Sequence, residues 1–421
     1  MSDRRNNIVP HIDWFSISIY GALVLIGWLN IYSAVNNPLH PSIFDFSQRY
    51  GKQFIWIITG FVMALLVMAS DASFFSVFAY PLYGITVLGL IAVRFVGRDI
   101  AGSHSWFRIG EIGIQPAELG IFAINLGLAK YLSNEKKASD LKKIRLVAAA
   151  MVMMPMLLII IQNETGVAVT YSAFIFVLYR EGLSGNILLG GFLLITLFIL
   201  ALVGNKIILS AILAGLALMG FLLFTRRKVK DLTKIGGILV FCLAIIFGTN
   251  YGFNHLELHQ KKRIQVFLQQ NVNNSKEGYN LHQAEIAIGS GGLYGKGYLQ
   301  GTQAKLNYVP AHATDFIFVT PCEEWGFIGA AFIVILYFVL IVRLIFLAER
   351  QRSVFSRIYG YGVASIFFIH VAINVGMNLG LMPVIGIPLP FISYGGSSFW
   401  AFTLLLFIFL RLDADRLQIL R

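Results

Sequence analysis

The acid with the most informative surroundings is Asp315, which lies in the segment His312-Ala313-Thr314-Asp315-Phe316, directly before an apolar run. An ionisable group at the edge of a membrane segment is costly unless it is paired or hydrated, so it marks a candidate site for handling protons, ions or substrates. A second interpretation is equally open from the spacing. In it, Asp315 is an interfacial acid that pairs with Lys305 or Arg263.

Two further acids and one cation border other apolar runs. Glu118 lies in IQPAELGIF, Glu164 in IIQNETGV and Arg108 in SHSWFRIG. Each of them alone is explained by a structural role. The topology derived below places all three in the same compartment as Asp315, and a shared water-filled cavity would join the four residues.

The stretch GSGGLYGKG at 289–297 superficially resembles a phosphate-binding P-loop. It fails the pattern because Ser290 stands at the first glycine position and Gly297 stands where Ser or Thr is required. We therefore interpret it as a loop whose glycines let the backbone approach a neighbouring segment closely.

The segment NVGMNLGLMPVIGIPLPFISYGGSSFW contains too many prolines and glycines for a regular helix. Irregular backbone at membrane depth is tolerated only where it is buried in protein or lines a cavity. The sequence predicts a re-entrant or capping segment at 383–393, with a plain rigid turn as the alternative.

Composition indicates the solvent in which these groups lie. Hydrophobic residues make up 57% and charged residues 13% of the 421 residues, and the mean hydropathy is +0.73. A soluble domain carries about 25% charged residues, so most of this surface must face lipid. Long apolar runs without alternation favour helices over a barrel. We predict an all-α, polytopic integral membrane bundle.

About twelve apolar runs approach the roughly 20 residues that span a bilayer. They lie near 14–34, 51–70, 74–94, 114–132, 146–162, 166–180, 185–203, 206–224, 234–254, 322–346, 358–382 and 394–412. The two cysteines, Cys242 and Cys322, lie in or beside these runs and form neither a disulfide framework nor a metal motif.

The basic segments predict the orientation of these spans. With an even number of spans, all of these segments and both termini fall on one side of the membrane, which is the cytoplasmic side. They are 1–5, 134–145, 226–234, 343–357 and 411–421. The net charge of +12 is thereby explained without a nucleic-acid partner. The intervals 35–50, 95–113, 255–320 and 383–393 are predicted outside, and 255–320 is the longest of them.

Several segments resemble, in order, the SEDS family of shape, elongation, division and sporulation proteins. They are IQPAEL, QNETG, RIQVFL, AIGSGGLYGKGYLQGTQAKL, HATDFIF followed by EEWGFIG, and NVGMNLGLMPVIGIPLPFISYGGSS. The resemblance implies one SEDS-type membrane domain over 1–421, whose large extracytoplasmic loop at 255–320 carries the catalytic motif. The N-terminal segment HIDWFSISIYGALVLIGWLNIYSA is more similar to the elongation branch than to the division branch.

The resemblance also implies a function. It predicts a multi-pass glycosyltransferase of the bacterial inner (cytoplasmic) membrane that polymerises lipid II into glycan strands during cell-wall elongation and cell-shape maintenance. The implied partners are a class B penicillin-binding protein, which is a transpeptidase, and other membrane proteins of the elongation complex. Two alternatives remain open, a flippase for lipid-linked precursors and a non-catalytic scaffold for the transpeptidase.

Site roles follow from the chemistry of the implied reaction, which needs a base near the lipid boundary on the outer side and cations for the pyrophosphate. Asp315 is the predicted general base, and Arg263 and Lys305 are predicted to stabilise the pyrophosphate. Further candidate substrate-binding residues are Glu118, Glu164, Arg108, His312, Gln283 and Ser393. No cofactor is evident, although a divalent cation such as Mg²⁺ or Mn²⁺ could also neutralise the pyrophosphate.

The chain departs from the family pattern in three places. Ala117 replaces the usual serine and Ile121 the usual lysine, while Glu164 stands where the family has aspartate. The lysine's loss removes a possible pyrophosphate contact or a partner for Glu118, so Arg108, Arg263 or Lys305 would have to serve. The family also has ten spans, so two of the predicted helices, within 185–254, are additional.

Overall fold

The computed structural model describes residues 9–36, 42–100, 103–109, 112–135, 141–224, 229–255, 258–268, 276–302 and 312–416. The chain divides into two compact units. The first comprises Met1–Gly182 and Tyr279–Arg421, and the second comprises Leu183–Gly278. Each unit is described by itself.

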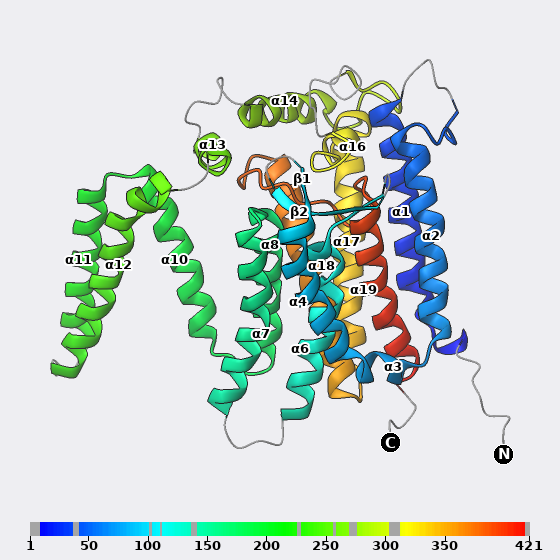
Figure 1. Ribbon diagram of the computed structural model, residues 1–421. Coiled ribbons are helices and arrows are strands. Elements are labelled where there is room, and N and C mark those ends of the chain that lie inside the picture. Colours follow the sequence, from blue (N-terminus) through cyan, green and yellow to red (C-terminus); the bar gives the residue numbers. More distant parts are fainter. Residues whose placement is uncertain are drawn as a thin grey trace. The chain divides into compact units, whose positions relative to one another are not determined.

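The first unit is a helical bundle centred on two C-terminal helices (Figure 1). Its helices are η1 (Val9–His11), α1 (Trp14–Val35), α2 (Arg49–Ala69), α3 (Ala72–Val77), α4 (Ala79–Val96), α5 (Pro116–Leu119), α6 (Ile121–Glu135), α7 (Leu141–Ile161), α8 (Thr165–Thr170), η2 (Tyr171–Ala173), α9 (Phe174–Arg180), most of α14 (Lys276–Gly291), α16 (Val319–Glu324), α17 (Gly326–Glu349), α18 (Val354–Asn378) and α19 (Gly396–Ala414). Helix α19 packs against α2, and α18 packs against α17, α6 and α9. These two helices are the most buried of the candidate spans, so they form the core.

Close approach of α6 to α18 depends on a glycine. A Cβ atom at Gly362 would lie 1.9 Å from Asn125 Oδ1. The Asn125 side chain instead donates a hydrogen bond of 2.9 Å to the carbonyl of Tyr359. A polar bond between helices in the core therefore fixes their register.

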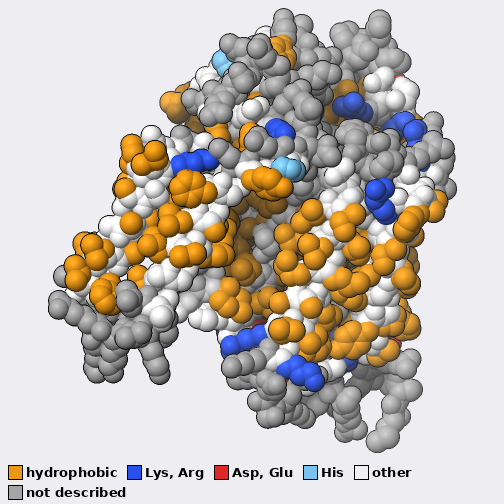
Figure 2. Space-filling model, turned by 60° about the vertical axis from the view of Figure 1, so that its left-hand side comes forward, with side chains coloured by type: hydrophobic (Ala, Val, Ile, Leu, Met, Phe, Trp, Pro, Cys, Tyr) orange, Lys and Arg blue, Asp and Glu red, His pale blue; other side chains and the backbone are white. Residues whose placement is uncertain are grey.

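Eight helices among the described residues are long and apolar enough to cross a membrane, and three shorter apolar helices accompany them. This confirms the predicted polytopic helical membrane fold, while the count of twelve spans stays a prediction. Hydrophobic side chains cover the flanks of the helices, and Lys and Arg side chains lie toward their ends (Figure 2).

Some predicted spans are interrupted. The run at 74–94 divides into α3 and α4, the run at 114–132 into α5 and α6, and the run at 166–180 into α8, η2 and α9. The run predicted at 322–346 begins as a span only at Gly326. The φ angle of Gly326 is +66°, a left-handed conformation that separates α16 from α17.

The outer loop at 95–113 forms a small antiparallel sheet that composition did not predict. It consists of β1 (Arg98–Ile100), β2 (Ser103–Ile109) and β3 (Ile112–Ile114), in the order β1-β2-β3. In the β2–β3 pairing Phe107 lies opposite Ile114. This sheet is the exception to the all-α prediction.

The second unit contains α10 (Gly185–Val203), α11 (Lys206–Phe224), α12 (Val229–His255) and α13 (Leu258–Phe267). Helices α10, α11 and α12 pack against one another around Leu197, Ala201 and Ile246. They occupy the interval in which the sequence predicts two additional helices. The long interval 255–320 includes α13, α14 and the start of α16, so much of its described part is helical.

Candidate functional site

Asp315 lies in a turn, 312–318, that precedes α16, and helix α18 holds its backbone. The carbonyl of Asp315 accepts hydrogen bonds from Asn374 Nδ2 at 2.9 Å and Asn378 Nδ2 at 3.1 Å. Asn374 Nδ2 also donates to the carbonyl of Ile387 at 2.7 Å. One asparagine thus joins the Asp315 turn to the proline-rich segment.

A second set of bonds joins the same two segments. The hydroxyl of Ser393 donates to the carbonyl of Thr314 at 2.7 Å and accepts from the amide of Leu389 at 2.8 Å. The amide of Tyr394 donates to the carbonyl of Ala313 at 2.9 Å. Ser393, a predicted substrate-binding residue, therefore positions the backbone next to Asp315.

The Asp315 carboxylate is half-buried and faces Gly386. A Cβ atom at Gly386 would lie 3.3 Å from Asp315 Oδ2, and the φ angle there is +74°. An L-residue would be strained in this left-handed conformation and would press on the carboxylate. Gly386 is therefore matched to Asp315 in both space and backbone conformation.

The proline-rich segment contains no regular helix from 383 to 393, as the sequence predicts, and it is buried in protein. Ile387 and Ile392 are fully buried. Helix α1 approaches so closely that a Cβ atom at Gly27 would lie 2.6 Å from Ile392 Cα. Tyr337 of α17 donates a hydrogen bond to the carbonyl of Pro390. This support from several helices makes irregular backbone tolerable inside a membrane protein.

Glu118, Glu164 and Asp315 lie in one region of the first unit. Glu118 lines a cavity with Ile387 and Pro388, the neighbouring Gly386 faces Asp315, and Gly166, two residues after Glu164, lies against the carbonyl of Ile385. Glu118 Oε2 accepts a hydrogen bond of 2.9 Å from Ser397 at the start of α19. Glu164 Oε1 accepts one of 2.6 Å from Ser105 of β2. The small sheet and α19 therefore supply hydroxyl partners for two of the three acids.

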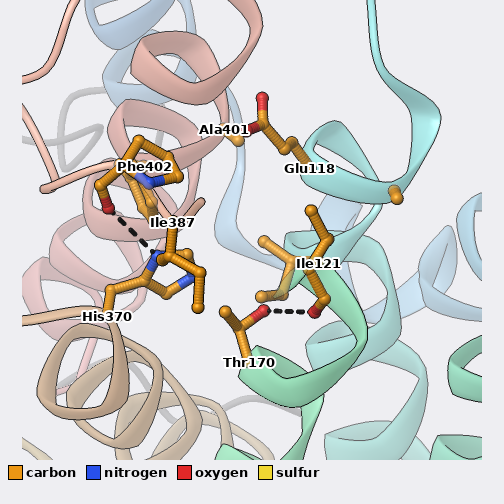
Figure 3. Close-up of a pocket in the computed structure, with 10 residues that line it drawn as sticks. Glu118, Ile121, Thr170, His370, Ile387, Ala401 and Phe402 are labelled. Atoms are coloured by element: carbon orange, nitrogen blue, oxygen red, sulfur yellow. Dashed lines mark hydrogen bonds between the residues drawn. The ribbon is translucent and has the colours of Figure 1, made fainter. Parts of the chain in front are cut away.

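A narrow cavity of about 10 Å³ adjoins Glu118 (Figure 3). That volume suits about one water molecule. Its lining residues are Ala117, Glu118, Ile121, Val167, Thr170, His370, Ile387, Pro388, Ala401 and Phe402. Of the acids named above, only Glu118 is among them. Ile121, which stands at the family's lysine position, contributes an apolar wall here. The volume of this cavity is too small for a sugar or a pyrophosphate.

The other predicted site residues are distributed differently. Arg108 is exposed on β2, Gln283 is half-buried on α14, and His312 is buried at the start of the Asp315 turn. Arg263 lies on α13 in the second unit. Lys305 lies outside the described residues.

The glycine-rich segment wraps around two buried acids, Glu323 and Glu324. The amides of Lys296 and Gly297 donate to the carbonyls of Glu323 and Glu324 at 3.0 and 2.9 Å. A Cβ atom at Gly295 would lie 2.1 Å from the carbonyl oxygen of Glu324. This geometry confirms that the glycines permit close backbone approach.

Side chains complete this arrangement. Lys296 Nζ lies 2.7 Å from Glu323 Oε1, which also accepts from the amide of Thr302 at 2.8 Å. Glu324 accepts a hydrogen bond from the hydroxyl of Ser33 in α1. Burial raises the pKa of the Glu324 carboxyl, and the bond from Ser33 acts in the opposite direction. The segment that leads toward Asp315 is thus fastened to the outer ends of α1 and α17.

The part of the chain that the structure describes contains no cluster of three or more His, Cys, Asp or Glu side chains arranged as metal ligands. Glu118, Glu164 and Asp315 are near one another but do not form such a group. We therefore assign no ligands for a divalent cation among the described residues.

Sequence reasoning did not single out Asn374, Asn378 or Ser105, and it named Gly386 only as a helix breaker, not as a contact of Asp315. The spacing of the two asparagines was a usable signal, because residues four apart lie on one face of a helix and can bind the same neighbouring segment. Gly386 and Ser105 carried none, since their partners are distant in the sequence.

Comparison with known proteins identifies the family. The model of the FtsW, RodA and SpoVE proteins, described as "Cell cycle protein", matches residues 13–418. The chain belongs to this family. The SEDS resemblance predicted from the motifs is thereby confirmed.

Individual relatives agree with this assignment. The peptidoglycan glycosyltransferase RodA of Treponema pallidum is 32% identical over 93% of this chain and 95% of its own length. The crystal structure of the rod shape determining protein RodA of Thermus thermophilus is 25% identical, covers 97% of this chain and 98% of that chain, and has a TM-score of 0.62. Among the branches, these relatives favour the RodA-like assignment made from the N-terminal segment.

A third similar structure comes from a complex. It is a chain from a peptidoglycan synthase complex that coordinates polymerisation and crosslinking. It is 26% identical, covers 97% of this chain and 99% of that chain, and has a TM-score of 0.72. The similarity therefore extends through both units of the chain.

Proposed function

We propose that this protein is a peptidoglycan glycosyltransferase that polymerises lipid II in the cytoplasmic membrane during cell-wall elongation. Family membership over residues 13–418 and the names of its relatives support this activity. The observation that carries the proposal is the way in which the fold holds Asp315. Its backbone carbonyl is bound by two asparagines, while its carboxylate remains only half-buried.

Such an arrangement suits a general base. A base must reach the acceptor hydroxyl within about 3 Å and keep its orientation through the reaction. The Asp315 turn is fastened to α18 and to the proline-rich segment, so the carboxylate is presented from a rigid support. Rigid placement of this kind lowers the entropic cost of the reactive geometry.

The proposed reaction is a single displacement. The carboxylate of Asp315 accepts the proton of the acceptor sugar's 4-hydroxyl as that oxygen attacks the anomeric carbon of the donor. The bond from the anomeric carbon to the lipid pyrophosphate breaks, and undecaprenyl pyrophosphate leaves with the electron pair. The α-linked donor becomes a β-linked product. One carboxylate suffices, in contrast to the paired carboxylates of glycosidases.

The leaving group needs positive charge. We assign this role to Arg263, Lys305 and Arg108, because the position three residues after Glu118 is Ile121 rather than a cation. Such cations stabilise charge that develops on the pyrophosphate. Glu118, Glu164, His312 and Gln283 are assigned to substrate binding. A divalent cation could share the task, but no step is derived through one.

The proposed partner is a class B penicillin-binding protein. The similar chain from the peptidoglycan synthase complex supports this, because that complex coordinates polymerisation with crosslinking. We expect this protein to co-purify with such a transpeptidase from its own host. Failure to recover any penicillin-binding protein would contradict the partner assignment.

The test is a polymerisation assay with the full chain, its partner, labelled lipid II and a transpeptidase inhibitor. We expect long glycan chains from the wild type and none from Asp315→Asn. Asp71→Asn is the matched control, because Asp71 is an exposed acid at the start of α3. If the protein is a scaffold, neither the wild type nor the variants will form glycan chains. If it is a flippase, it will move lipid II across the membrane of vesicles without polymerising it.

A further inference from the structure

The carbonyl groups of the proline-rich segment need hydrogen-bond donors from elsewhere in the fold. Pro388 and Pro390 have no backbone N–H, so the segment cannot form a regular helix of its own. The carbonyls of Ile387 and Pro390 accept hydrogen bonds from side chains, Asn374 of α18 and Tyr337 of α17. Buried carbonyls without such donors would be costly inside a membrane protein.

The carbonyl of Pro388 meets a residue that the proposed reaction does not use. Nδ1 of His370, in α18, lies 3.4 Å from this oxygen. A carbonyl can only accept a hydrogen bond, so Nδ1 carries the hydrogen and donates it. Figure 3 shows His370 beside Ile387 at the narrow cavity. His370 therefore supplies a third side-chain donor to this segment.

Packing fixes the orientation of the imidazole ring. His370 is buried, and its ring meets the ring of Phe402 in α19 edge-on. The ring centroids are 4.8 Å apart and the planes are at 83°, which is a favourable arrangement for two aromatic rings. The ring cannot turn Nδ1 away from Pro388 without losing this contact.

His370 belongs to a row of three buried polar side chains on α18. His370, Asn374 and Asn378 are spaced by four residues, which places them along one face of the helix. His370 contacts the carbonyl of Pro388, and Asn374 binds the carbonyl of the residue before it. Asn374 and Asn378 both bind the carbonyl of Asp315. The row therefore runs from the proline-rich segment to the backbone of the candidate base.

The segment that His370 contacts is also confined from the side of α8. A Cβ atom at Gly166 would lie 2.2 Å from the carbonyl oxygen of Ile385. The next residue, Gly386, faces the carboxylate, since a Cβ atom there would lie 3.3 Å from Asp315 Oδ2. Gly386 is only two residues before Pro388, so a displacement of the Pro388 carbonyl would move the backbone that the carboxylate faces.

We propose that His370 is a positioning residue for the reaction, which holds the Pro388 carbonyl through Nδ1 and thereby sets the place of Gly386 beside the Asp315 carboxylate. This inference rests on the proposed glycosyltransferase activity. His370 acts through the proline-rich segment and not on the substrate. Its loss should therefore lower turnover and leave the affinity for lipid II nearly unchanged. The requirement is a donor at the reach of Nδ1, which an amide can also supply.

Two variants separate the hydrogen bond from packing. His370→Leu keeps nearly the same volume but has no donor. His370→Asn leaves more empty space, but its amide nitrogen is bonded to Cγ, as Nδ1 is in histidine. If the bond positions the segment, the asparagine variant will be the more active of the two. If the ring only fills space, the leucine variant will be the more active.

The assay is polymerisation of labelled lipid II by the full chain with its partner, with kcat and KM measured separately. We expect His370→Leu to lower kcat roughly tenfold, with KM nearly unchanged, and His370→Asn to recover most of the loss. Hydrogen–deuterium exchange of the same preparations gives a readout without substrate. Exchange in 383–394 should rise in His370→Leu and stay near the wild-type level in His370→Asn.

Asn125→Leu is the matched control. It also removes a buried side-chain bond to α18, but to the carbonyl of Tyr359, away from the proline-rich segment. We expect it to lower the melting temperature and to leave kcat and the exchange of 383–394 unchanged. If His370→Leu does not fold, His370→Gln takes its place, because its amide lies one carbon further out and misses the Pro388 carbonyl.

An unchanged kcat or unchanged exchange in His370→Leu would overturn the inference. Equal losses in His370→Leu and His370→Asn would also overturn it, as would a loss of kcat in Asn125→Leu as large as that in His370→Leu. A wild type that makes no glycan chains would instead contradict the proposed function, and the exchange experiment distinguishes this case because it measures the contact without the reaction.

Discussion

Glycines near Asp315 and glycines in the second unit occupy opposite environments. A Cβ atom at Gly166 would lie 2.2 Å from the carbonyl of Ile385, and one at Gly386 would lie 3.3 Å from Asp315 Oδ2. Gly190 and Gly215, in α10 and α11, would meet nothing within 4 Å. Glycine near the site permits contact between segments, whereas in the second unit it leaves an unfilled surface.

Hydrogen bonding shows the same contrast. Near Asp315, side chains of α18 bind backbone carbonyls of the Asp315 turn and the proline-rich segment. In the second unit, the described side-chain bonds of Thr196, Ser210 and Thr249 return to their own helices. The site region is therefore cross-linked by polar groups. In the second unit these three bonds do not cross between helices, and α10, α11 and α12 meet at the small core of Leu197, Ala201 and Ile246.

The largest expected effect is that of Asp315→Asn. The amide keeps the shape of the side chain but cannot accept the acceptor proton, and positioned bases contribute about 10²–10⁴-fold. We expect chain formation to fall by at least that factor, with expression and partner binding near normal. The assay is lipid II polymerisation with thermal unfolding measured on the same preparation. If Asp315 only anchors Lys305 or Arg263, melting temperature will fall together with activity, and a stable variant that makes long chains would refute the assignment.

Glu164→Gln should have the next largest effect, because it removes the charge that stands where the family has aspartate. We expect most polymerisation to be lost, while Glu164→Asp keeps much of it. The Ser105 hydroxyl, which donates to Glu164 Oε1, can bond either an amide oxygen or a carboxylate. The comparison therefore isolates charge, and equal rates for all three proteins would show that the position is structural.

Asn374→Leu should break the link between the two irregular segments. It removes the side-chain donor to the carbonyl of Ile387 and one of the two donors to the carbonyl of Asp315. An unsatisfied buried carbonyl costs about 1–3 kcal/mol. We expect a lower melting temperature together with reduced polymerisation. Asn30→Leu is the control, because Asn30 donates only to Ile26 of its own helix among the described bonds. Similar losses in both variants would argue against a specific role for Asn374.

The smallest effects should come from a pair of glycine substitutions. Gly386→Ala places an L-residue at a φ of +74° beside Asp315, at a cost of roughly 1–2 kcal/mol, and should slow polymerisation by about tenfold. Gly190→Ala lies in open space inside a helix and should stabilise it by up to about 1 kcal/mol. Melting curves and initial rates measured in parallel would check the expected loss of rate in Gly386→Ala and the expected gain of stability in Gly190→Ala. An unchanged rate in Gly386→Ala would show that the carboxylate tolerates a methyl group there.

Local patterns determined much of this protein. Apolar runs and basic segments predicted a helical membrane fold, and the prolines predicted irregular backbone at 383–393. The spacing of the glycines at 289–297 predicted a loop that packs closely against a neighbouring segment. The family motifs identified the family. All of these depend on neighbours in the sequence, because hydropathy, helix breaking and motif spacing are local properties.

Tertiary structure decided which of these segments meet. Ser393 binds Thr314 and Asn374 binds Asp315, and each pair is separated by tens of residues. The small sheet that brings Ser105 to Glu164 and the division into two units were likewise not encoded in any local pattern. Contacts of this kind form because packed helices bring distant backbone carbonyls beside buried donors that must be satisfied. Sequence therefore supplied the acid, and the fold determined how it is held.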